Sequence, residues 1–217
     1  MLKPLLTLLL ICIPFTLSAA EKPLNVIFLL VDDWGWTDAG CFGSDLYETP
    51  HIDRLAADGM KFTNAYASCT VCSPTRASVM TGMYPGRTNV TDWIPGHSER
   101  FPNRYPMLPP EWTQKLEQKH TTIAEALRAA DYRTAHVGKW HLTPRSDDLE
   151  VLKPYYPDRH GFEINIAGNQ WGAPATYFWP FKRKNASGVG SRTMNFPAGG
   201  KQGDYLTDTL TDETGTI

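Results

Sequence analysis

A cysteine and an arginine stand four residues apart in the sequence Cys-Ser-Pro-Thr-Arg, which runs from Cys72 to Arg76. Pro74 is typical of the first position of a helix, so we expect a helix that Cys72 or Ser73 caps and that Gly82 ends. The unpaired N–H groups at a helix start attract sulfate or phosphate, and an arginine one turn later can hold a tetrahedral oxyanion. The segment therefore predicts an anion-processing site with Cys72 as the potential nucleophile, although a buried cysteine beside a surface arginine fits these five residues equally well.

A second group of candidate functional residues is Lys139 and His141, in a Gly-Lys-Trp-His sequence that follows a predicted strand. In an extended segment the side chains alternate, so Lys139 and His141 project to one face and Trp140 to the other. This places a cation beside a group that can transfer protons. A strand edge that meets solvent is the structural alternative for such a pair.

An acidic pair, Asp32 and Asp33, directly follows the apolar run 24–31. The run has the length and pattern of a strand covered on both faces in a parallel sheet. Ligands of open α/β sheets bind beyond the carboxyl ends of the strands, and hard carboxylate oxygens suit Ca²⁺ or Mg²⁺. The pair is thus a candidate metal site, and an acidic loop start is the alternative interpretation.

The cysteines permit a different function. Cys69 and Cys72 have the two-residue spacing of redox and zinc motifs, but no second metal-type pair accompanies them. A thiol–disulfide protein that uses Cys69 and Cys72 at a helix start therefore remains an alternative.

Helix and strand signals alternate along the chain and must position these residues. A capped helix is predicted over 50–59, a strand over 60–66, a helix over 122–130 and a strand over 132–137. This alternation favours an α/β fold with a largely parallel sheet. Segments 92–118 and 143–203 are rich in Pro, Gly and aromatic residues without a sustained period, so we expect long loops that select the substrate.

Residues 1–20 have the pattern of an export signal, with Lys3 before an apolar stretch and small residues Ser18 and Ala20 before the cleavage point. We expect a soluble exported protein, periplasmic or extracellular, without a membrane anchor, in which residues 21–217 form one partial domain. The net charge of −2 over 217 residues gives no reason to expect nucleic acid as a partner.

Three segments together resemble the formylglycine-dependent sulfatases: the apolar run ending in Asp32-Asp33 with the block 49–55, the Cys-x-Pro-x-Arg signature from Cys72 to Thr81-Gly82, and Gly-Lys-Trp-His. The resemblance covers roughly residues 23–212. It implies an alkaline-phosphatase-like α/β fold and a sulfuric ester hydrolase of the arylsulfatase type, acting on aryl sulfates or sulfated carbohydrates.

The resemblance also implies roles for individual residues. Cys72 is expected to be oxidised to formylglycine by a formylglycine-generating enzyme or an anaerobic sulfatase-maturating enzyme, and to contact Ca²⁺ together with Asp32 and Asp33. Arg76 is expected to support the formylglycine, Lys139 to contact the sulfate, and His141 to hydrogen-bond the nucleophile and the substrate.

Members of the family are much longer than this chain. Residues 204–213 read as the start of a further helix, and Gly215 with no apolar stripe after Leu210 leads us to expect a truncation or a frameshift. We therefore expect little or no sulfatase turnover from the chain alone. The alternatives are a phosphohydrolase of the same superfamily, the thiol–disulfide protein and a non-catalytic remnant.

Overall fold

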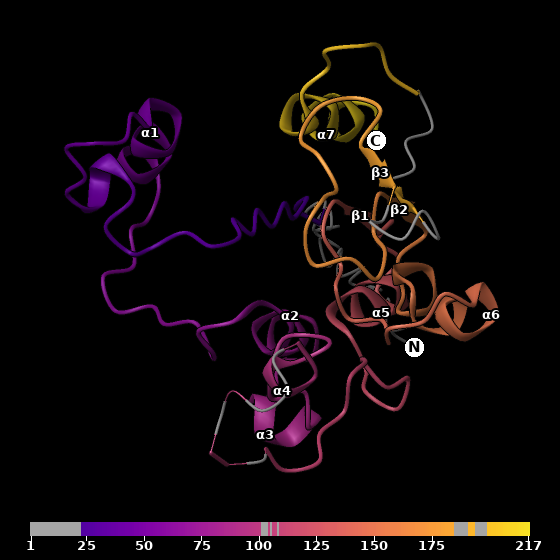
Figure 1. The fold of residues 1–217 in the computed structure, drawn as a ribbon. Coiled ribbons are helices and arrows are strands. Elements are labelled where there is room, and N and C mark those ends of the chain that lie inside the picture. Colours follow the sequence, from indigo (N-terminus) through magenta and orange to yellow (C-terminus); the bar gives the residue numbers. More distant parts are fainter. Residues whose placement is uncertain (1–22, 101–103, 105, 108, 185–190, 194–198) are drawn as a thin grey trace, which may run out of the picture. The chain divides into compact units, whose positions relative to one another are not determined.

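The computed structural model describes residues 23–100, 104, 106–107, 109–184, 191–193 and 199–217 (Figure 1). The predicted export signal, 1–20, lies outside these residues. The chain divides into two units, Met1–Asp32 and Asp33–Ile217, and each is described by itself. In the described part of the chain, no helix has the length and apolar character needed to cross a membrane.

The described part of the first unit is the apolar run predicted to be a covered strand. Residues 23–31 form no strand, and their side chains are exposed, with Leu24 at 82% and Ile27 at 78%. A strand exists only through hydrogen bonds to a neighbouring strand, and no described residue provides this run with a ladder. The run is apolar as a buried strand would be, but it pairs with no described strand. The prediction of a covered strand over 24–31 is therefore not met.

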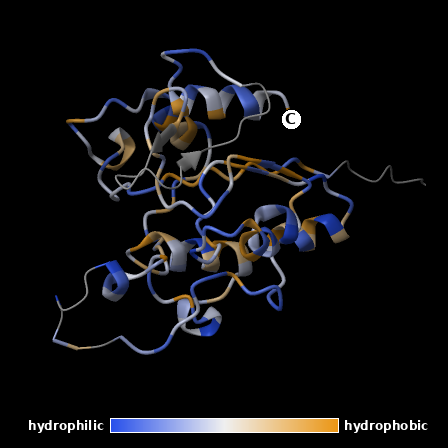
Figure 2. Cartoon of the chain, turned by 45° about the vertical axis from the view of Figure 1, so that its right-hand side comes forward, coloured by the Kyte–Doolittle hydropathy of each residue, from blue (hydrophilic) through white to orange (hydrophobic). Residues whose placement is uncertain are grey.

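The helices of the described residues lie in the second unit. The α-helices are α1 (Pro50–Asp58), α2 (Cys72–Thr81), α3 (Pro85–Thr88), α4 (His97–Arg100), α5 (Ile123–Ala129), α6 (Leu149–Leu152) and α7 (Leu206–Gly215), and the 3-10 helices are η1 (Gly40–Phe42), η2 (Lys153–Tyr155) and η3 (Pro157–Arg159). The helices predicted near 50, 72, 122 and 204 are confirmed as α1, α2, α5 and α7. Several helices carry hydrophobic and hydrophilic stretches along the same ribbon, as expected for elements with one buried side (Figure 2).

Helix α2 begins two residues earlier than its sequence predicts. Val71 is the extended N-cap residue, Cys72 is the first helical residue, and neither Cys72 nor Ser73 is the cap. Proline lacks only an N–H, and every N–H in the first helical turn is without an intrahelical partner, so Pro74 is compatible with the third position as well as the first. Gly82 ends the helix as predicted, at φ 67°, with its N–H donating to the Ser78 carbonyl at 2.8 Å.

Two small sheets are present among the described residues. Strand β1 (Ala135–Val137) pairs in parallel with β2 (Ile164–Ile166), and β3 (Lys182–Lys184) pairs antiparallel with β4 (Ser191–Thr193). Strand β1 lies inside the predicted strand 132–137, and the α/β class with a parallel pair is confirmed. The other three strands arise in segment 143–203, expected as loop, because three residues are too short to show a sequence period.

The strand predicted over 60–66 is absent, and its apolar side chains, Met60, Phe62 and Tyr66, are exposed. Alternation alone does not make a strand where no described partner supplies hydrogen bonds.

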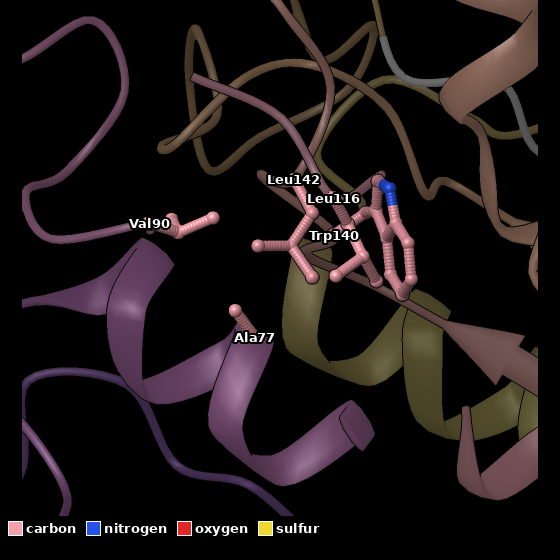
Figure 3. Packing of buried hydrophobic residues seen from close by; sticks show 5 residues of the cluster. All are labelled: Ala77, Val90, Leu116, Trp140 and Leu142. Atoms are coloured by element: carbon pink, nitrogen blue, oxygen red, sulfur yellow. The ribbon is translucent and has the colours of Figure 1, made fainter. Parts of the chain in front are cut away.

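A hydrophobic cluster joins α2 to the segment after β1. Its buried members are Ala77 on α2 together with Val90, Leu116, Trp140 and Leu142 (Figure 3). The Leu116 N–H donates to the Leu142 carbonyl at 2.8 Å, and this bond holds the segments around residues 116 and 142 together at the cluster. Ala77 follows Arg76 in the chain, and Trp140 and Leu142 flank His141. This packing therefore sets the positions of the candidate site residues Arg76 and His141.

The start of α5 is tied to the same region by Thr122. Its hydroxyl accepts a hydrogen bond from the Glu125 N–H at 3.2 Å and donates one to the His160 carbonyl at 2.7 Å, while the Glu125 carboxylate accepts from the Thr122 N–H at 2.7 Å. This is the predicted capping box, with one additional bond to a distant segment.

The first prediction concerns this cap. Thr122→Ala removes an N-cap acceptor and leaves the buried His160 carbonyl without that donor, so we expect a loss of about 1–2 kcal/mol in the free energy of unfolding, measured by denaturant titration. Thr121→Ala, at the exposed neighbouring position, is the matched control and should change it by less than about 0.5 kcal/mol. Equal effects of the two substitutions would contradict the assignment.

Two histidines pack against Trp140. The rings of His136 and His160 lie 5.3 and 5.5 Å from the Trp140 ring, and Phe162 contacts His136 edge-on. Burial is the main cause that lowers the pKa of His136 to about 4, with a smaller contribution from the nearby Arg76 charge, and a hydrogen bond to the Lys139 backbone opposes the shift. Burial also lowers the pKa of His160 below its ordinary value. The fold thus keeps both rings neutral.

The second prediction follows from these lowered pKa values. Between pH 6.5 and about 4 the unfolded chain binds more protons at His136 than the folded chain, so the stability is complete above this range and decreases as the pH falls through it. We expect His136 to contribute a loss of up to about 3 kcal/mol in the free energy of unfolding. Denaturant titrations across this range should show a smaller loss for His136→Phe, whereas His51→Phe, at an exposed position, should behave like the unchanged protein.

Candidate active site

The first residue of α2 meets the histidine of the Gly-Lys-Trp-His segment. The Cys72 Sγ atom lies 3.2 Å from Nδ1 of His141, although the two residues are 69 positions apart in the sequence. Cys72 is half-buried and His141 is buried. The predicted partnership between His141 and the nucleophile position is therefore present in the geometry.

The predicted cations come from the same two segments. Arg76 is buried, and its Nη1 donates a hydrogen bond to the Lys139 carbonyl oxygen. A buried guanidinium is costly unless it is hydrogen-bonded, so this contact holds α2 and residue 139 together. The contacts between helix α2 and the chain after β1 thus bring together four of the predicted residues: Cys72, Arg76, Lys139 and His141.

The backbone around His141 differs from the extended segment that its sequence suggests. Gly138 has φ 94° and His141 has φ 58°, so the chain turns after β1 instead of continuing as a strand. The His141 N–H donates to the Asn169 carbonyl at 3.1 Å. The alternation argument for Lys139 and His141 therefore does not apply, and the hydrogen bonds to α2 and to residue 169 orient His141 instead.

Two residues near His141, Ser73 and Ile94, were not assigned a role in the site from the sequence. The fully buried Ser73 hydroxyl donates to the His141 carbonyl at 3.0 Å and accepts from the Ile94 N–H at 3.2 Å. The Ile94 carbonyl lies 2.6 Å from Nε2 of His141. Ser73 lies inside the signature, so its position could have suggested a hydrogen bond to a site residue. Ile94 acts through its backbone, for which the sequence has no signal.

The acidic pair is placed differently. Asp32 and Asp33 are exposed and fall on either side of the division between the two units, and Asp33 has φ 54°. Within the described ranges, no three His, Cys, Asp or Glu side chains come close enough together to hold a metal ion. The carboxylates have the right chemistry for Ca²⁺, and no chemical step is derived through a metal.

The cysteines of the thiol–disulfide alternative are free in the structure. Cys41, Cys69 and Cys72 carry no disulfide, and all three are partly buried. The Cys69 carbonyl accepts a hydrogen bond from the Thr75 hydroxyl at 2.9 Å. The side chain that faces Cys72 is the imidazole of His141, an arrangement suited to a nucleophile with a proton-accepting neighbour.

The arrangement brings together the elements of an anion-transfer site. A residue at the first position of a ten-residue helix lies at the positive end of the helix dipole, where a tetrahedral oxyanion is favoured. The imidazole is within hydrogen-bonding distance of that residue and can accept or return a proton. Arg76 supplies a permanent positive charge one turn into the same helix.

Comparison with known proteins shows similarity to sulfatases over most of the chain. The family model "Sulfatase" matches residues 24–217. The chain is 36% identical over 168 residues to N-acetylgalactosamine-6-sulfatase of Sus scrofa, covering 77% of this chain and 28% of that protein. It is 41% identical over 123 residues to N-acetylgalactosamine-6-O-sulfatase of Bacteroides thetaiotaomicron, covering 57% of this chain and 21% of that protein.

Solved structures agree with the fold. The crystal structure of Ps i-CgsB has a TM-score of 0.61 at 26% identity, covering 85% of this chain and 39% of that chain. A structure in complex with its substrate, D-glucosamine-2-N,6-O-disulfate, has a TM-score of 0.57 at 25% identity, covering 88% of this chain and 30% of that chain. The predicted alkaline-phosphatase-like α/β class is thereby confirmed. The chain spans 28% of the length of the Sus scrofa relative, and with the family model matched from residue 24 to 217 it belongs to the sulfatase family.

Proposed function

We propose that this chain carries the nucleophile-bearing part of a sulfatase that hydrolyses sulfate esters through a formylglycine formed from Cys72. The observation that carries the proposal is the meeting of two segments, in which Cys72 contacts His141 and Arg76 binds the Lys139 backbone. The family membership supports sulfate as the oxyanion.

Formylglycine, in its hydrated form, supplies one hydroxyl that attacks sulfur and a second whose proton loss expels the sulfate afterwards. The residues around it have separate tasks in the proposal. Nδ1 of His141, 3.2 Å from the Cys72 sulfur, exchanges a proton with the group at position 72. Arg76 keeps positive charge at the first turn of α2, and Lys139 contacts a sulfate oxygen as the second cation.

Calcium remains part of the proposal without a step of its own. Asp32 and Asp33 offer adjacent hard oxygen ligands, and residue 72 would complete the contact with the ion. Ca²⁺ is proposed in preference to Mg²⁺, because an exposed acidic pair on irregular backbone tolerates the flexible geometry that calcium accepts.

The proposed substrate class is sulfated carbohydrate. Two relatives are named N-acetylgalactosamine-6-sulfatases, one structural neighbour was solved with D-glucosamine-2-N,6-O-disulfate, and Ps i-CgsB was solved with a neocarrahexaose. The proposal also includes a maturation enzyme as partner, and export to the periplasm or the extracellular space, which rests on the sequence of residues 1–20.

The third prediction tests the nucleophile. When the chain is produced together with a sulfatase maturation enzyme, the peptide containing Cys72 should lose one sulfur and two hydrogens and gain one oxygen, as measured by mass spectrometry. Cys72→Ala should abolish the change, and Cys41→Ser, outside the signature, should not affect it. A thiol that stays unmodified at position 72 would contradict the proposal.

The same preparations measure turnover. Aryl sulfate should be hydrolysed faster than aryl phosphate by the matured protein, and Cys72→Ala should remove this difference. Faster phosphate hydrolysis would favour the phosphohydrolase alternative. The expectation that the 217-residue chain alone has little turnover stays a prediction, and this assay tests it.

The fourth prediction concerns the metal. If Asp33 is a calcium ligand, added Ca²⁺ should raise the melting temperature of the protein by mass action, and Asp33→Asn should remove most of that increase. Asp45→Asn, which changes another exposed carboxylate, should keep the increase. An unchanged melting temperature in saturating calcium, together with no calcium uptake by equilibrium dialysis, would exclude the proposed site.

A further inference from the structure

We infer that Gly172 and the Ile94 carbonyl are positioning elements for His141, which hold its imidazole in the Nε2–H tautomer with the Nδ1 lone pair facing residue 72. The catalytic consequence rests on the proposed function, whereas the orientation of the ring is a property of the chain itself.

The tautomer follows from the Ile94 contact. A carbonyl oxygen only accepts hydrogen bonds, and it lies 2.6 Å from Nε2 of His141, so Nε2 carries the proton. In a neutral imidazole the other nitrogen, Nδ1, then has a lone pair and no hydrogen. Both atoms of this contact are buried, which favours its persistence.

Ser73 leaves that lone pair to residue 72. Its hydroxyl has one proton and lies 3.0 Å from the His141 carbonyl and 3.3 Å from Nδ1. The shorter contact takes the proton, and the oxygen accepts from the Ile94 N–H. The Cys72 thiol, 3.2 Å from Nδ1, can donate its proton to this lone pair, and a hydroxyl formed at the same position could do the same.

Gly172 provides the space that the ring occupies. A Cβ atom at this position would lie 2.3 Å from Cε1, 2.7 Å from Nε2 and 2.8 Å from Nδ1 of His141, closer than real carbon contacts allow. The same loop binds the His141 backbone, because the Asn169 carbonyl accepts the His141 N–H, and the loop is itself held by the Trp171 N–H donating to the Asn169 side chain at 2.9 Å. The His141 ring is therefore held by the loop at Gly172 as well as by the hydrogen bond at Nε2, and any side chain at position 172 displaces it.

The fifth prediction tests Gly172→Ala. In the ¹⁵N spectrum of histidine-labelled protein at about pH 8, above the ordinary imidazole pKa, His141 should show a protonated Nε2 and a bare Nδ1, with the signals assigned through His141→Asn. Gly172→Ala should shift these signals or split them between two tautomers. Any turnover of an aryl sulfate by the matured protein should fall in kcat by about 10- to 100-fold in this variant, with KM changed by less than about threefold, since the ring no longer aligns with residue 72.

Gly86→Ala is the matched control, because a Cβ at Gly86 meets no atom within 4 Å. It should leave the His141 signals and kcat unchanged, and thermal unfolding of both variants separates misfolding from displacement. A protonated Nδ1 in the unchanged protein, or His141 signals that Gly172→Ala does not move, would overturn the inference. The expected signals together with a thiol that stays unmodified at position 72 would instead count against the proposed function alone, since the spectrum needs no maturation.

Discussion

The site depends on one contact between segments, the hydrogen bond from the buried Arg76 guanidinium to the Lys139 carbonyl. A charge in this position is tolerated only with hydrogen-bond acceptors, so the start of α2 and the chain after β1 must stay together. The next residue along α2, Ala77, packs with Trp140 and Leu142 in the hydrophobic cluster. Two consecutive residues of the helix thus hold the two segments together, Arg76 by a hydrogen bond and Ala77 by hydrophobic packing. Cys72 meets His141 because both contacts form together.

The segment that Arg76 binds contains two histidines, His136 and His141, in different surroundings. His136 packs against Trp140 and Phe162, and the loss of water together with the Arg76 charge lowers its pKa to about 4, so this ring remains a neutral packing element. His141, five residues later, lies among the polar atoms of Ser73, Cys72 and the Ile94 backbone. Two residues of one type therefore take different roles, because one faces aromatic rings and the other faces hydrogen-bonding groups.

The sequence predicts what depends on local signals. Helix α1 begins at its proline, α2 ends at its glycine and α5 has its capping box as expected, although α2 begins two residues earlier than predicted. The signature residues Cys72, Arg76, Lys139 and His141 come together. The strands expected at 24–31 and 60–66 fail because a strand requires a partner elsewhere in the chain, which no local pattern guarantees. Strand β2, in contrast, is too short for a pattern and forms because β1 pairs with it.

The unpredicted part of the site is built from the two segments expected as long loops. Ile94 contributes a carbonyl and an N–H, Asn169 contributes a carbonyl, and Gly172 contributes the lack of a side chain. Backbone atoms are common to all residues, so the identity of residue 94 matters less than the path of the chain that brings its carbonyl to Nε2 of His141. Substitutions at such a position are tolerated more readily than insertions that change this path. The segments that the sequence assigned only to substrate selection therefore also hold the His141 imidazole in place. A change in the length of either loop would have to preserve the contacts of the Ile94 and Asn169 carbonyls with His141 to keep the ring aligned.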